Sequence, residues 1–155
     1  MEKAFMIIPK RESDKLDEAL ALAETAGYKI IRIWKTRYAR RIGRGLLEEI
    51  VSAVREETPD AIIFYGEPQP STVFQLMKGS GVKVIDRVSL ILEIFVKHAG
   101  SREAQLQIEM ARIKHELPLI REFIRRSKMG ELPGFLGPGG YAVDAYYRNL
   151  TRRLA

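Results

Sequence analysis

Cysteine is missing from the 155-residue sequence, and histidine occurs only twice, at His98 and His115. The missing thiols exclude disulfides, thiolate catalysis and cysteine-ligated metals, and neither histidine has an acidic cluster nearby to complete a metal site. We therefore expect no metal and no cofactor, and we interpret both histidines as solvated side chains.

Long apolar runs are missing too. No stretch approaches the ~18 uncharged apolar residues that a membrane helix needs. Residues 1–9 form a short apolar run followed by Lys10 and Arg11, without the small-residue cleavage site of a secretory signal. With 46% apolar and 30% charged residues, the composition indicates a soluble, globular, cytoplasmic protein with no membrane partner.

Recognisable catalytic motifs are also lacking. The sequence has no nucleophile with a base, no carboxylate pair at a typical spacing and no Gly-Lys-Ser/Thr of a phosphate-binding P-loop. The acids Glu48, Glu49, Glu56 and Glu57 alternate with apolar positions and fit a solvated helix face. We therefore predict that the chain is not an enzyme and hydrolyses neither GTP nor ATP.

The first half of the sequence instead alternates strand-like and helix-like patterns. Short apolar or β-branched runs predict strands at residues 4–8, 28–34, 60–65 and 82–85. Helical spacing of apolar residues lies between them, at residues 13–26, 46–54 and about 68–77. This order predicts an α/β fold, with a small four-stranded parallel sheet and flanking helices.

The second half has no strand signal. A helix is expected over residues 87–99, and Ser101 caps a longer one that continues through Pro118 to Lys128. A Gly/Pro segment at 130–140 and a last helix at 142–154 complete a coiled-coil-like helical hairpin. We expect an α/β subdomain at 1–86 and a helical-hairpin subdomain at 87–155.

Basic residues are in excess, which gives a net charge of +6 and a field that attracts polyanions such as nucleic acids. Residues 32–47 contain six arginines and lysines, no acid, and Trp34 and Tyr38 between them. Such a mixture suits phosphate contacts and stacking on unpaired RNA bases. We expect RNA contacts from Arg37, Arg40, Arg41, Arg44, Arg125, Arg126, Lys128, Arg148, Arg152 and Arg153. The group around Arg125 has an alternative role, which is to compensate the negative end of its helix.

Two glycine-containing loops add to these candidates. Gly43 and Gly45 precede a predicted helix, where free N–H groups can hold a phosphate, or they form only a turn. Gly137 and Gly139, in the loop 134–140, can approach RNA closely, or they only connect the two hairpin helices.

The longest resemblance to a known family is carried by residues 84–95 (VIDRVSLILEIF) and 101–111 (SREAQLQIEMA), followed by Leu117-Pro118. Together with Ile-Gly-Arg-Gly at 42–45 and Gly-Pro-Gly at 137–139, they resemble the amino-terminal domain of HflX-type ribosome-associated GTPases. The resemblance implies an α/β unit with a helical hairpin whose tip reaches toward the peptidyl transferase region. It also implies the ribosome as partner, through the rRNA of the large subunit.

The leading hypothesis is a non-enzymatic ribosome-binding factor that modulates translation under stress or hibernation, by blocking subunit association or the active site. The alternatives are a nucleotide-binding regulatory α/β module, a fragment of a ribosome-splitting GTPase, or a protein-binding helical seam. The long helix exceeds the last one by about half its length. Leu106 and Met110 would then lie beyond the last helix. Either the α/β half covers them, or they pair with a second copy in a homodimer.

Overall fold

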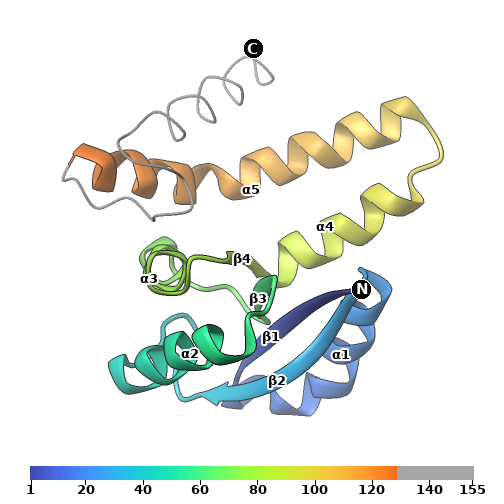
Figure 1. Cartoon of the computed structure of the whole chain (residues 1–155). Coiled ribbons are helices and arrows are strands. Elements are labelled where there is room, and N and C mark those ends of the chain that lie inside the picture. The colour runs from blue at the N-terminus through green and yellow to red at the C-terminus, as the bar shows by residue number, and fades with distance from the viewer. Residues whose placement is uncertain (129–155) are drawn as a thin grey trace.

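A four-stranded, fully parallel sheet lies at the centre of the computed structural model, which describes residues 1–128. The strand order is β2-β1-β3-β4, so the first strand lies inside the sheet (Figure 1). The strands are β1 (Glu2–Pro9), β2 (Tyr28–Thr36), β3 (Ala61–Phe64) and β4 (Lys83–Asp86). The predicted α/β fold with a four-stranded parallel sheet is therefore confirmed.

Helices connect each strand to the next, as the pattern predicted. These connections are a 3-10 helix η1 (Lys10–Lys15) with α1 (Leu16–Thr25), then α2 (Arg44–Glu57) and α3 (Pro70–Ser80). After β4 follow α4 (Arg87–His98) and α5 (Arg102–Lys128). The first predicted helix begins later than expected, because the chain after Pro9 first forms a tighter turn. Its Ser13 hydroxyl donates to the Lys10 carbonyl.

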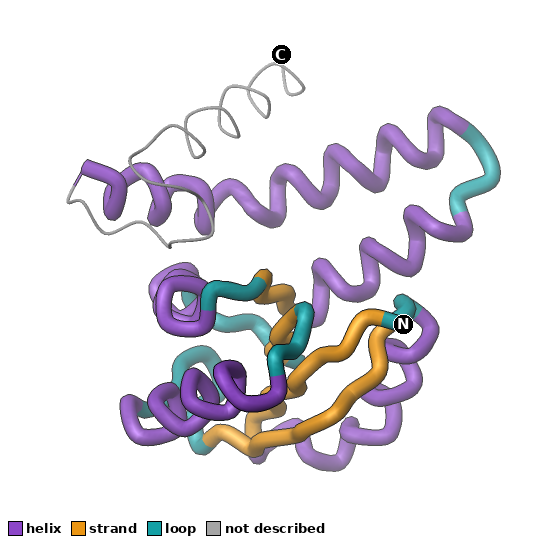
Figure 2. The backbone as a smooth tube through the Cα atoms, viewed as in Figure 1, coloured by secondary structure: helices purple, strands orange, loops and turns teal. Residues whose placement is uncertain are grey.

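The two faces of the sheet bury alternate residues of β1 beneath different helices. Phe5 and Ile7 pack against α2 and α3, whereas Met6 and Ile8 pack against α1 and α4. All residues from 4 to 8 have no exposed surface, which explains why this strand reads as a continuous apolar run. Figure 2 shows the strands in orange between the purple helices.

The long helix α5 is anchored to the α/β unit through its second half. Phe123 is 6% exposed and packs edge-on against Phe74 of α3, with 5.5 Å between the ring centroids. At the other end, the Ser101 hydroxyl accepts a hydrogen bond from the Ala104 N–H at 3.1 Å, which confirms Ser101 as the cap. The helix continues through Pro118.

The beginning of α5 packs beside α4 and lies away from the sheet and α3 (Figure 1). Leu106 is 50% exposed and Met110 is 44% exposed.

None of the described helices is long and apolar enough to cross a membrane. The predicted helix at 142–154 lies outside the described residues, and the division of the chain at residue 86 stays a prediction.

We predict that Phe123→Ala destabilises the protein by about 3–5 kcal/mol, since it removes a buried aromatic ring from the junction of α3 and α5. Urea unfolding followed by circular dichroism measures the change. The control is Phe95→Ala on α4, where the ring is 52% exposed and its loss should cost far less. Equal losses for the two variants would contradict this account of the anchor.

Candidate functional site

A basic loop, residues 37–43, joins β2 to α2 at the carboxyl edge of the sheet (Figure 2). Its backbone is fixed to α3. The Arg40 carbonyl accepts from the Gln69 N–H at 2.8 Å and from the Thr72 hydroxyl at 3.2 Å. The Arg40 Nε donates to the Glu67 carbonyl at 3.0 Å. The loop therefore has a defined shape while Arg37, Arg40 and Arg41 remain exposed.

The two aromatic residues near this loop have different environments. The Arg41 guanidinium lies 3.5 Å from the centre of the Tyr38 ring, at the surface. Trp34 is only 8% exposed and packs against Phe5. The interpretation that Trp34 stacks on RNA bases is therefore wrong, because its alternation with exposed residues on β2 directs its ring into the core.

The first turn of α2 follows the basic loop directly. Gly43 caps the helix in an extended conformation without any side-chain hydrogen bond, and the first turn contains no acid. The Leu47 N–H donates to the Gly43 carbonyl at 2.9 Å. The N–H groups before it have no acceptor within the helix, and the helix dipole adds positive charge there. Gly45 faces open space. A phosphate role for Gly43 and Gly45 stays a prediction.

The second basic group, at the end of α5, is partly neutralised. Glu122 accepts from Arg125 at 2.6 Å and from Arg126 at 2.9 Å. The hydrogen bonds from Arg125 and Arg126 lower the pKa of Glu122, so its carboxylate stays ionised and offsets part of their charge. Arg126 also lies 5.0 Å from the centre of the Phe74 ring on α3. The basic loop and this group therefore both contact α3.

Several predicted site residues cannot be compared with the structure. Lys128 ends α5 as its last described residue. The others lie outside the described part of the chain: Gly137, Gly139, Arg148, Arg152 and Arg153.

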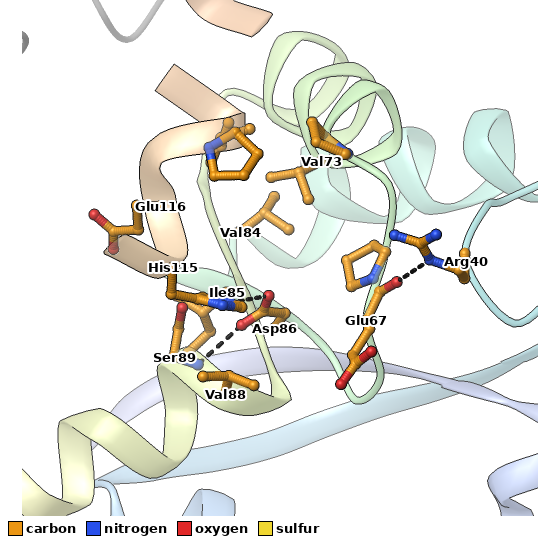
Figure 3. Close-up of a pocket in the computed structure, with 14 residues that line it drawn as sticks. Arg40, Glu67, Val73, Val84, Ile85, Asp86, Val88, Ser89, His115 and Glu116 are labelled. Atoms are coloured by element: carbon orange, nitrogen blue, oxygen red, sulfur yellow. Dashed lines mark hydrogen bonds and ion pairs between the residues drawn. The ribbon is translucent and has the colours of Figure 1, made fainter. Parts of the chain in front are cut away.

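A cavity of about 350 Å³ opens where β3 and β4 end, bounded by α3, α4 and α5 (Figure 3). Its polar lining includes Arg40, Glu67, Asp86, His115 and Glu116. Three carboxylates against one arginine and one histidine make this cavity unfavourable for a phosphate group. Neither of the two candidate glycines lines it, so the elements of the predicted nucleotide site are not brought together here.

Asp86 connects two helices at this cavity, as Figure 3 shows. One carboxylate oxygen accepts from the Ser89 N–H at 2.9 Å and caps α4, and the other lies 2.6 Å from the His115 Nε2 on α5. The interpretation of His115 as a solvated side chain is therefore wrong. Sequence reasoning missed the pair because 29 residues separate its members, and no local pattern connects them.

Comparison with known proteins gives matches along nearly the whole chain. The family described as GTP-binding GTPase N-terminal matches residues 13–96, and the one described as GTP-binding GTPase middle region matches residues 98–155. The GTPase HflX of Hyperthermus butylicus is 51% identical, over 89% of this chain and 38% of that protein. The GTPase HflX of Methanocaldococcus jannaschii is 38% identical, over 94% of this chain and 36% of that protein.

Solved structures match as well. The crystal structure of SsGBP in complex with GDP is 29% identical with a TM-score of 0.70, over 99% of this chain and 42% of that one. A GTP-binding protein from Sulfolobus solfataricus in complex with GDP is 28% identical with a TM-score of 0.67, over 99% of this chain and 44% of that one. The chain thus spans less than half the length of these proteins.

These matches correct one prediction from the sequence. The relatives are named GTPases, so the expectation that the protein is not an enzyme is wrong. That expectation depended on missing motifs in a stretch that covers 38% of the Hyperthermus butylicus protein. Motifs can be judged only in the part of a protein that is searched.

We predict that Asp86→Ala destabilises the protein more than Asp86→Asn. Alanine removes the α4 cap, which is worth about 0.5–2 kcal/mol, together with the contact to His115. Asparagine keeps a capping oxygen, but its amide nitrogen replaces the oxygen that faces the imidazole, so the contact with His115 is weakened while the cap remains. Urea unfolding gives the ranking, and Asp14→Ala at an exposed position is the control. If both Asp86 variants unfold like the control, the double role of Asp86 is refuted.

Proposed function

Because the chain belongs to the HflX family of GTPases, we propose that it is a part of such a GTPase that binds the ribosome through rRNA. The names of the relatives support the assignment to a GTPase, and the exposed basic loop supports the proposed contact with rRNA. GTP binding and hydrolysis belong, in this proposal, to the activity of the full-length relatives, whose length the chain covers only in part.

The observation that carries the proposal is the shape and charge of the basic loop. Arg37 and Arg41 are exposed, no acid occurs between residues 32 and 47, and hydrogen bonds to α3 fix the backbone at Arg40. A loop with a fixed backbone binds phosphates through its guanidinium groups with less loss of conformational entropy than a mobile loop. The free N–H groups at the start of α2 add a second source of attraction for phosphate.

The resemblance in sequence supports the large subunit as the target. A domain that occupies a subunit surface can interfere with subunit joining or with use of the active site. We propose that this chain affects translation by such interference, including under stress or in hibernation. We also propose that the protein acts in the cytoplasm, where the ribosomes are. The second basic group contributes less, because Glu122 neutralises part of it.

We predict that Arg37→Glu/Arg41→Glu abolishes most co-sedimentation with isolated large subunits, since it removes phosphate contacts and adds repulsion. Rising salt should weaken binding of the unchanged protein steeply. Arg40 is left intact because it holds the loop to α3. The control, Lys3→Glu/Lys29→Glu, makes the same charge change at exposed positions on the opposite edge of the sheet. Equal binding of both variants would remove the loop from the interface.

We also propose a homodimer formed through the start of α5, where Leu106 and Met110 are half exposed. Met110→Lys should lower the apparent mass in sedimentation equilibrium at micromolar concentrations, whereas Glu103→Lys, at an exposed polar position of the same helix, should not. A monomeric mass for the unchanged protein contradicts the dimer.

A further inference from the structure

A groove of about 690 Å³ lies between α2 and α3. Its apolar lining residues are Ile42, Leu47 and Val51, and its charged lining residues are Arg44, Arg55 and Lys78. This volume falls within the roughly 300–1,000 Å³ of ordinary ligand sites. The groove is separate from the cavity at the ends of β3 and β4, because no residue lines both.

The charge of the groove has one sign. All three charged lining residues are basic, and the acids of α2 are not among the lining residues. Glu48 pairs with Arg44 at 3.4 Å, but these side chains are 70% and 92% exposed. An ion pair so open to water contributes little to stability, so Arg44 can exchange Glu48 for a phosphate. The groove therefore favours an anionic occupant.

The shape of the groove is set by the packing of its two helices. A Cβ atom at Gly79 would lie only 2.9 Å from the Val51 Cγ2, so the absence of a side chain there lets α3 approach α2 closely. Arg44 and Arg55 lie eleven positions apart on α2, a rise of about 16 Å. At roughly 3.4 Å for each stacked nucleotide, this distance corresponds to about five nucleotides.

We propose that this groove binds a short single-stranded segment of RNA. Arg44, Arg55 and Lys78 hold phosphates, and a base lies against the apolar lining around Val51. The amide of Gln75, which also lines the groove, can bind a base edge. RNA fits better than an acidic peptide, because cations around an apolar floor match a strand in which phosphates alternate with flat, apolar-faced bases.

The inference rests on the proposed function and extends it. Arg44 follows the basic loop and also lines the groove. An RNA strand bound at Arg37 and Arg41 can therefore continue along α2 toward Arg55. The loop and the groove then form one path, although each can be tested with residues that the other does not contain.

The test measures binding of a fluorescently labelled single-stranded RNA oligonucleotide by anisotropy over a range of salt concentrations. Arg55→Gln/Lys78→Gln removes two phosphate contacts, so the slope of log affinity against log salt should fall by roughly 1.4, at about 0.7 for each contact. Lys3→Gln/Lys29→Gln, with the same loss of charge at exposed positions, should leave the slope nearly unchanged. Photo-crosslinks from 4-thiouridine RNA should map to α2 and α3.

A slope that is the same in both variants overturns the groove as an RNA site. Competition by polyglutamate as effective as competition by RNA of equal charge also overturns it, because the surface would then prefer an acidic polypeptide. If the salt slope is unchanged in the Arg55/Lys78 variant and the Arg37/Arg41 variant no longer co-sediments with subunits, the groove fails and the proposed function stands. If the groove binds RNA but the protein binds no subunit, the groove stands and the proposed function fails.

Discussion

Burial of β1 on both faces is the constraint on which the rest of the structure depends. Residues 4 to 8 have no exposed surface, so helices must cover the sheet on each side. The parallel strand order makes α1 cross on one face and α2 and α3 on the other. Every strand then ends at the same edge, and the loops there carry the charged and polar groups. The basic loop and the cavity beside Asp86 are both consequences of this arrangement.

The sequence predicted the elements well because local patterns determine them. The apolar run at β1 and the spacing in α2 are visible within a few residues, and Ser101 marks its helix through its own hydroxyl. The pairing of Asp86 with His115 depends on how two distant segments pack, which no local pattern encodes. The stacking role of Trp34 was wrong for another reason, because charge counting ignores the alternation along β2 that turns its ring toward Phe5.

The candidate interface was predicted in part. Charge counting finds the loop at residues 37–43, because an acid-free stretch is a property of the sequence. It cannot find the groove, because Arg55 and Lys78 belong to different helices and come together only when α2 packs on α3. It also leaves out Glu122, which lies three and four positions before Arg125 and Arg126, a helical spacing at which an acid pairs with a base.

The carboxylate of Asp86 serves two helices at once, capping α4 and contacting α5. In evolutionary terms, substitutions at positions 86 and 115 therefore have unequal consequences. A change at residue 115 affects one contact and leaves the cap of α4 in place, whereas most changes at residue 86 disturb both helices together. Divergence at this junction is therefore freer on α5 than on β4, and a new side chain at position 115 can be accommodated more readily around an unchanged aspartate.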